Sequence, residues 1–547
     1  MSATDMKKAI SMKKQPLALV MVATALLLTA TAHAAAPGIT GPTFNLTAQA
    51  ASISQPDGQG VYSWGYGCTT PTSVAFVPAT TTTPFCNTMQ VPGPTLVVTE
   101  GQTVTVTLTN GLPTPAGNTS ILFPGFNVTT SCSASPAVGA AGLLTCEAAP
   151  GGTVTYTFTA GSPGTRAYYS GTQGDLQVEM GLYGAIIVLP NGAPTNGACP
   201  THNTAAGLNS AGTALATGGE SDFRLSPTGA AYHLTQSCYD REYLFQFSEI
   251  DPNIHIQALA QVSAKAGCTA GAAGCSLNVP TEPYHPVYFM INGRSMPDDM
   301  DTNYAAQYPH QPYNGNPHMH PGELVLLRII GQGRWQHPFH EHGNHVRILG
   351  RDGNVILSSA SGAGASQLAG PLLFTTTTTP GLAMDGIFYW TGKGLNWDAY
   401  GHHPGSADPL ATLPCTADAN GYYTSNLTAV NYYEWCQDHN KPLQAAPFGD
   451  VAGGGPATLP DANLFTNGAW YGGSPYLGPD ATVRAAGPTG STPPSGTIAN
   501  PPTTEAGFAF MWHSHNEREI TTNNIFPGGM LMMMLVDSRE FVIDESN

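Results

Sequence analysis

Polar and apolar residues alternate strictly in one part of the chain. From Thr103 to Thr109 every second residue is a threonine, and the residues between them are valine or leucine. Such a period of two predicts a β-strand with one buried face. Three further apolar runs, at 241–249, 288–293 and 323–330, are also predicted strands. With Gly 63 and Pro 46 in 547 residues and few helical repeats, the sequence predicts an all-β protein built of packed layers.

Residues 1–34 have the layout of a secretory signal peptide. Lysines precede an apolar run from Leu17 to Leu28, and Ala32-His33-Ala34 offers small residues for cleavage. We therefore expect an exported protein, either periplasmic or extracellular. The apolar run is too short to span a membrane, and no later stretch reaches about 18 uninterrupted apolar residues. No membrane span is expected.

Charge and cysteine content narrow the class of protein further. The formal net charge is −17, which disfavours binding to nucleic acid and favours attraction of cations. An even number of cysteines, 10, in an exported chain indicates disulfides rather than thiolate ligands. The simplest arrangement joins sequence neighbours: Cys68 with Cys86, Cys132 with Cys146, Cys199 with Cys238, Cys268 with Cys275, and Cys415 with Cys436.

Two short segments concentrate the candidate chemistry. Residues 337–343 read His-Pro-Phe-His-Glu-His-Gly, and residues 513–519 read His-Ser-His-Asn-Glu-Arg-Glu. Because strand side chains alternate, both imidazoles of a His-x-His pair lie on one face of a strand. Two such strands side by side would form a pocket of four histidines, which are His340, His342, His513 and His515.

These segments resemble the third and fourth copper motifs of the multicopper oxidase family, H-P-x-H-x-H-G and H-C-H-x3-H. By position, the resemblance makes the four pocket histidines ligands of a copper cluster and His337 a ligand of a mononuclear blue copper. Ser514 stands where the family has the blue-copper cysteine, and Glu519 stands where it has the second blue-copper histidine. A hydroxyl cannot replace the soft thiolate that defines a blue-copper site. The electron-entry site is therefore expected to be absent.

The N-terminal half also resembles this family, in residues 91–110 and 164–188. The family's motifs S-I-H-W-H-G and G-T-x-W-Y-H-S-H are present here without their histidines. The substituting residues are Leu122, Pro124, Tyr169 and Gly171. The resemblance thus implies the family's fold and only half of the ligands of its copper cluster.

The fold implied by the resemblance is two cupredoxin-like Greek-key β-sandwich domains. The first is expected at 40–190, a linker or long loop at 191–235, and the second domain at 236–547. A large insertion, at about 401–505, has no counterpart in the family and separates the two histidine segments. The metal site is expected between the two domains, with Tyr169 facing it.

The residue types do not decide which metal ion would be bound. Copper is favoured by the resemblance and by the imidazole ligands, while zinc, iron or manganese are alternatives if Glu341, Glu517 or Glu519 adds an oxygen donor. A second candidate is the loop pair of His318 and His320. The methionine-rich run 530–536 is interpreted as a buried strand.

Two functions follow as hypotheses. The first is an exported copper-binding protein of multicopper oxidase type, acting as an oxidoreductase with a reduced or altered copper site. The second is a non-catalytic metal-binding or extracellular structural protein on the same scaffold. Ordinary laccase-type activity is not expected, because the blue-copper thiolate and the N-terminal histidines are missing. The substrate and the oligomeric state are left open by the sequence.

Overall fold

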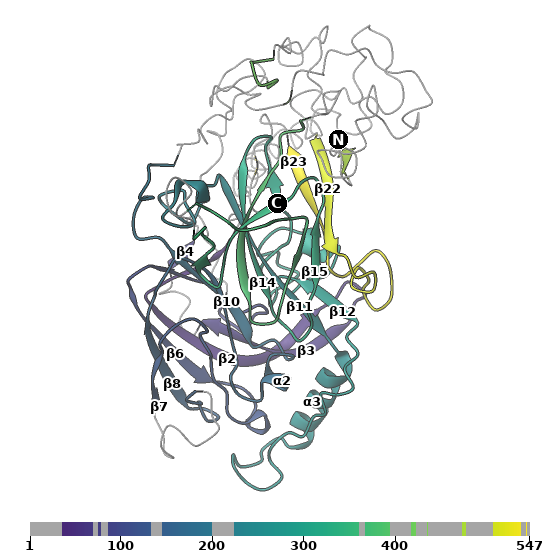
Figure 1. Cartoon of the computed structure of the whole chain (residues 1–547). Coiled ribbons are helices and arrows are strands. Elements are labelled where there is room, and N and C mark those ends of the chain that lie inside the picture. The colour runs from purple at the N-terminus through teal and green to yellow at the C-terminus, as the bar shows by residue number, and fades with distance from the viewer. Residues whose placement is uncertain are drawn as a thin grey trace, which may run out of the picture.

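The computed structural model (Figure 1) is built of β-strands packed in layers. It describes residues 36–68, 75–77, 86–132, 145–199, 224–359, 367–393, 417–422, 435, 473–476, 507–537 and 543. The expected signal peptide, most of the expected insertion, and Cys415 and Cys436 lie outside these residues. Within them, the predicted all-β sandwich fold is confirmed.

The strands between residues 38 and 189 form an N-terminal sandwich of two sheets. One sheet has the order β4-β1-β5-β10-β9, and the other has the order β3-β2-β6-β8-β7. The alternating segment 103–110 is β6, whose valines and leucine point into the core between the two sheets. The strands are β1 (Gly38–Thr40), β2 (Thr43–Ser54), β3 (Gly60–Cys68), β4 (Ala75–Val77), β5 (Leu96–Thr99), β6 (Thr103–Asn110), β7 (Thr129–Cys132), β8 (Thr153–Thr159), β9 (Gly164–Tyr169) and β10 (Tyr183–Leu189).

The strands between residues 241 and 537 form a C-terminal sandwich. Its first sheet, the inner sheet, has the order β12-β11-β14-β20-β16-β17, and its second, the outer sheet, has the order β13-β23-β22-β15-β19. β18 pairs with β16, and β21 pairs with β22. The strands are β11 (Arg241–Ile250), β12 (Tyr288–Ile291), β13 (His318–Met319), β14 (Leu324–Gly331), β15 (Pro338–Glu341), β16 (Val346–Arg351), β17 (Asn354–Val355), β18 (Leu372–Leu373), β19 (Thr375–Thr377), β20 (Ala383–Tyr389), β21 (Gly473–Tyr476), β22 (Gly507–Ser514) and β23 (Leu531–Asp537).

The core of the C-terminal sandwich is rich in aromatic side chains and methionines. Phe245 and Phe247 of the inner sheet meet Phe339 and Trp512 of the outer sheet in edge-on and tilted contacts. Three methionines of the run 530–536, at positions 530, 532 and 534, are fully buried in this core. This placement matches the interpretation of the run as a buried strand.

Within the described ranges helices are few and short, and one of them was not anticipated from the sequence. α3 (Pro252–Ala264) begins after Asp251, whose side chain accepts a hydrogen bond from the backbone of Asn253, with proline in the first turn. This Asp-Pro start signal is typical of a helix N-terminus. The other helical turns are η2 (Thr114–Ala116), α2 (Gly174–Gln177), η3 (Thr235–Ser237) and η4 (Asp298–Met300).

The two sandwiches share buried contacts through β9 and β10 on one side and the inner sheet on the other. An apolar cluster there joins Ala185 and Ile187 to Leu244, Ile330 and Ala383. The order of layers therefore places the outer sheet farthest from the N-terminal sandwich.

A buried polar network crosses the same contact. Arg328 of β14 pairs with Glu242 at 2.8 Å and with Asp385 at 3.5 Å. Asp385 in turn accepts hydrogen bonds from the backbone and the hydroxyl of Thr165 on β9. These side chains are at most 1% exposed, so the charges satisfy one another rather than water.

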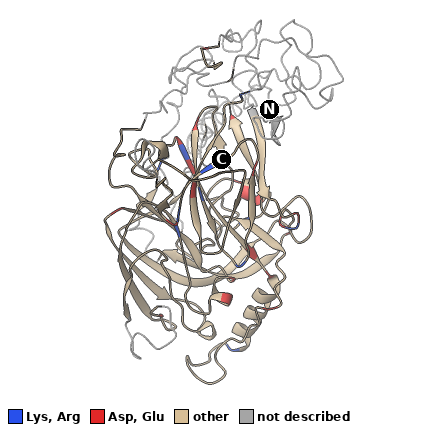
Figure 2. Cartoon of the chain, viewed as in Figure 1, with Lys and Arg blue, Asp and Glu red and all other residues tan. Residues whose placement is uncertain are grey.

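Three of the expected disulfides are confirmed, Cys68–Cys86, Cys199–Cys238 and Cys268–Cys275. Charged residues are sparse along the ribbon (Figure 2), as the 10% content implies. Among the described residues no helix has both the length and the apolar character needed to cross a bilayer.

Candidate metal centre

The two histidine segments lie side by side on the outer sheet. β15 and β22 pair antiparallel in a register that sets His340 opposite His513. Phe339 and Trp512 point into the core, so His340 and His513 project from the opposite face of the sheet. His342 follows the end of β15 and joins them from the same side.

Three imidazoles converge to within metal-binding range. Ring nitrogens of His340, His342 and His513 all lie within 4.8 Å of one another. Nε2 of His513 and Nε2 of His342 are 3.2 Å apart. Two nitrogens bound to one ion at about 2.0–2.1 Å in tetrahedral geometry lie about 3.3 Å apart. The His342 and His513 nitrogens therefore already have the spacing of two ligands of one ion, and a nitrogen of His340 lies near enough to be a third.

His515 stands at the open side of this cluster. Its ring centre lies 4.8 Å from that of His340 and 5.5 Å from that of His513. Its side chain is 53% exposed, whereas His340 and His513 are buried. The structure thus brings all four pocket histidines together, three as a compact group and His515 as a solvent-facing fourth.

Neighbouring groups orient the buried rings. Nδ1 of His513 donates to the carbonyl of Ser514 at 2.7 Å, and Nδ1 of His340 lies 2.7 Å from the hydroxyl of Thr375 on β19. Hydrogen bonds at Nδ1 fix the ring orientation and direct Nε2 toward a metal. Phe374, 42% exposed, packs edge-on against His340. Thr375 and Phe374 lie in a threonine-rich segment that gave no signal of a site.

The environment favours neutral, metal-accepting imidazoles. Burial, reinforced by the neighbouring histidines, lowers the pKa of His340 from 6.5 to about 4. Burial also lowers the pKa of His513. Both rings are therefore unprotonated at neutral pH and present the lone pairs that a copper ion requires.

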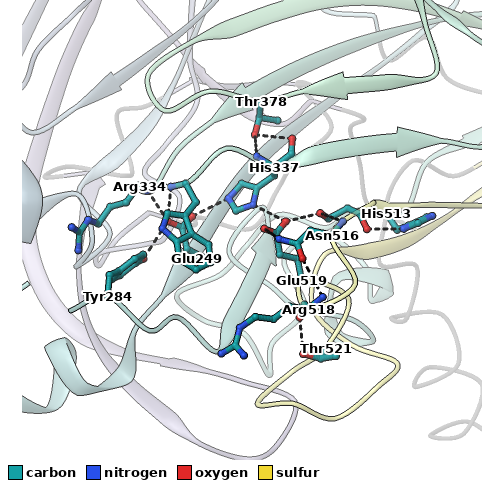
Figure 3. A network of polar contacts seen from close by, with 12 residues as sticks. Glu249, Tyr284, Arg334, His337, Thr378, His513, Asn516, Arg518, Glu519 and Thr521 are labelled. Atoms are coloured by element: carbon teal, nitrogen blue, oxygen red, sulfur yellow. Dashed lines mark hydrogen bonds and ion pairs between the residues drawn. The ribbon is translucent and has the colours of Figure 1, made fainter. Parts of the chain in front are cut away.

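His337 lies outside this group. Its Nδ1 is 2.9 Å from Glu519 and its Nε2 is 2.9 Å from Glu249, so a carboxylate engages each ring nitrogen (Figure 3). Burial alone would lower the pKa of His337, but the hydrogen bonds and charges of the two carboxylates outweigh it and raise the pKa to about 9. His337 is an imidazolium at neutral pH.

The residues at the family's blue-copper positions do not suit a blue copper ion. The Ser514 hydroxyl donates to Glu519, the same carboxylate that contacts His337. Glu519 also accepts from the side-chain amide of Asn516 at 2.8 Å. The three residues at the family's blue-copper positions are thus bonded to one another, with no thiolate among them.

At the N-terminal positions where the family has copper histidines, other side chains pack against one another and against glycines. Leu122 pairs through its backbone with Tyr169, and its side chain occupies the space that a Cβ at Gly171 would need. The Tyr169 hydroxyl lies against Gly381, 3.2 Å from where a Cβ would stand there. The partners named above for the four histidines all belong to the C-terminal sandwich.

The acidic candidates are placed away from the three-histidine group or at its rim. Glu341 points to the opposite face of β15, and its burial raises its pKa to about 8. Glu517 is exposed, with an oxygen 4.0 Å from Nδ1 of His515. His318 and His320 lie elsewhere, with Nδ1 of each bonded to Asp537.

The raised pKa of His337 makes the stability of the metal-free protein depend on pH. The contribution is fully present below the unfolded-state pKa of about 6.5 and is lost as the pH rises toward 9. A pKa that is higher by one in the folded state stabilises the fold by about 1.4 kcal/mol. We expect guanidinium unfolding at pH 6 and pH 9 to show this loss. His337→Gln should flatten the difference between the two pH values, and an unchanged difference in that variant would contradict the assignment.

Comparison with known proteins finds similarity to multicopper oxidases. Two family models, both described as multicopper oxidase, match residues 69–193 and 280–381. An L-ascorbate oxidase of Brassica rapa subsp. pekinensis is 39% identical over 99 residues, which span 18% of this chain and 16% of that protein. The blue copper oxidase of Nitrosomonas europaea gives a TM-score of 0.40 at 14% identity, covering 90% of this chain and 85% of that chain. The copper nitrite reductase of the same organism gives 0.34 at 17% identity, covering 64% and 85%.

Proposed function

The chain belongs to the multicopper oxidase family, and from that premise we propose that it is an exported copper-binding protein with one histidine-lined copper site. His340, His342 and His513 hold the ion in this proposal, and His515 adds a fourth nitrogen from the solvent side. The convergence of three ring nitrogens within 4.8 Å carries the proposal.

The donor set favours copper among the metals considered. Imidazole nitrogens suit copper and zinc, whereas hard oxygen donors would favour manganese or magnesium. The carboxylate of Glu341 points away from the cluster, and that of Glu519 is engaged by His337 and Ser514. Family membership adds weight to copper over zinc.

The chain's own residues prepare this site in three ways. Thr375 and the Ser514 carbonyl orient two of the rings. Burial keeps His340 and His513 unprotonated. The exposed His515 leaves one side of the cluster open to solvent. Copper held there would supply a one-electron redox centre and a Lewis acid.

Four-copper oxidase chemistry is not part of the proposal. A blue-copper relay needs a thiolate, and Ser514 offers a hydroxyl that is already donated to Glu519. Leu122, Pro124 and Gly171 offer no ligand atoms from the N-terminal sandwich. Reduction of dioxygen to water on several adjacent coppers therefore has no ligand set here.

A second candidate function is an oxidoreductase that uses this altered copper site alone. The solvent-facing position of His515 favours it because a small molecule would reach the cluster from that side. Export is supported by the signal-like residues 1–34 and by the disulfides. The compartment, periplasmic or extracellular, belongs to the same proposal.

Copper loading of the purified protein tests the proposed function. We expect one tightly bound copper per chain and no intense blue absorption, because no thiolate is available for charge transfer. Steady-state oxygen consumption with a phenolic donor is expected to equal that of free copper. An intense blue band would defeat the proposal. Turnover that survives removal of loosely bound copper and disappears in His513→Ala would favour the oxidoreductase instead.

A further inference from the structure

Three buried side chains form an alternating triad beside the metal centre. Glu249 of β11, His337 before β15 and Glu519 after β22 are each at most 1% exposed. His337 touches both carboxylates at 2.9 Å, one through each ring nitrogen. A histidine can donate through both nitrogens only as an imidazolium. The triad therefore holds one proton more than a neutral imidazole would bring.

Both carboxylates have hydrogen-bond donors besides His337, which for Glu519 are the side chains of Ser514 and Asn516. Oε1 of Glu249 accepts from the backbone amides of Arg334 at 2.7 Å and Trp335 at 2.8 Å. The Tyr284 hydroxyl lies 3.2 Å from the same oxygen. These donors satisfy charges that would otherwise be costly to bury. The arrangement is a satisfied ionic network rather than a remnant of a lost metal site.

The triad is connected by hydrogen bonds to a histidine of the proposed metal site. Oε2 of Glu519 accepts from the Ser514 hydroxyl as well as from His337, and the carbonyl of Ser514 accepts from Nδ1 of His513. Oε1 of Glu519 holds Asn516, next to His515. Figure 3 shows Glu519 between His337 and the turn that carries these residues. Glu519 thus fixes the backbone on which both C-terminal histidines stand.

At its other end the triad reaches the N-terminal sandwich. The Tyr284 hydroxyl lies 2.7 Å from Glu179, and Arg334 stacks over the Tyr284 ring with its guanidinium carbon 4.1 Å from the ring centre. Glu179 also accepts from the backbone of Asp251 and lies 3.6 Å from His255. The polar contacts therefore run from the N-terminal sandwich to the strand that bears His513.

We propose that the Glu249–His337–Glu519 triad takes the place of a second metal ion, with a proton on His337 joining the strands that a metal would join, and that Glu519 is a positioning residue for His513 and His515. The inference rests on the proposed copper site for its readout. It predicts that the chain binds copper at the histidine cluster alone and that the geometry of this copper depends on a carboxylate that does not coordinate it.

The variant Glu519→Gln tests the positioning role. It keeps the shape of the side chain and removes the charge that holds His337 and Ser514. We expect the dissociation constant for copper(II), measured by chelator competition, to rise at least about tenfold, with a changed copper electron paramagnetic resonance spectrum. Asn516→Ala, at an exposed residue, should give a smaller change of the same kind. Glu242→Gln is the matched control, because it removes a buried carboxylate from the Arg328 pair, and copper affinity should stay within about twofold of wild type.

The proton is tested separately on metal-free protein labelled with 15N-histidine. At pH 7 both ring nitrogens of His337 should show one-bond couplings to hydrogen, and His337→Gln should remove these signals. A neutral His337 at pH 7 would overturn the triad, and so would a second copper that is lost in His337→Gln. Wild-type copper affinity and spectrum in both Glu519→Gln and Asn516→Ala would overturn the positioning role. In that case one tight copper in the wild-type protein would leave the proposed function standing, whereas no copper in the wild type would defeat the function itself.

Discussion

Replacing His340 and His342 together by alanine is expected to abolish stoichiometric copper binding. The double variant leaves only His513 and the exposed His515, and the 3.2 Å approach of two Nε2 atoms that defines the site is gone. Loss of residues that merely orient ligands costs about 10–100-fold in affinity, so loss of two ligands should exceed that range. Metal analysis after gel filtration, together with chelator competition, measures the effect.

A matched double substitution separates ligand loss from general damage. His233→Ala with His285→Ala removes two histidines that lie outside the cluster and should leave copper content unchanged. Both double variants should keep their disulfides and their far-ultraviolet circular dichroism. Full copper content in the His340 and His342 variant would place the metal elsewhere, with His318 and His320 as the first pair to replace.

The second large effect is expected at the contact between the sandwiches. Arg328→Ala removes the guanidinium that pairs with both Glu242 and Asp385. Two carboxylates then stay buried without this cation, a change that costs about 3–5 kcal/mol of folding free energy. Guanidinium unfolding, followed by tryptophan fluorescence, should show an earlier transition.

Controls for this prediction come from the same sheets. Arg351→Ala removes an exposed arginine at the end of β16 and should change the unfolding free energy by no more than about 0.5 kcal/mol. Replacing Arg328, Glu242 and Asp385 together by apolar residues of similar volume should recover much of the loss, because no buried charge is then left unpaired. An Arg328→Ala protein as stable as wild type would contradict the role assigned to this network.

Local patterns were sufficient to predict several of the strands and the faces on which their side chains lie. The alternation of threonine with valine and leucine predicts β6, and the structure buries the apolar residues of that strand. The same period of two predicts that His340 faces away from Phe339 and that His513 faces away from Trp512. These features depend on neighbours one or two positions away, and a sequence displays such neighbours directly.

The helix α3 and the site's supporting residues were not predicted. An Asp-Pro start was visible at 251–252, but the helix has no strong apolar period because it lies against the N-terminal sandwich through only a few residues, such as Ile254 and Ala258. Thr375 and Phe374 lie within a threonine-rich segment with no ligand pattern. Their roles arise from the pairing of β15 with β19.

The sequence by itself determined the all-β class, the same-face histidine pairs and the absence of a thiolate, because each depends only on residue type and strand alternation. The pairing of the two histidine segments was also expected, from the resemblance, and only the tertiary structure decided that His337 joins Glu249 and Glu519, which are 88 and 182 positions away. Glu249 lies near the end of β11, and nothing near it in the chain marks its partner. The protonation of His337 follows from its contacts with two carboxylates, which outweigh the opposing effect of burial, and these contacts exist only in the folded chain.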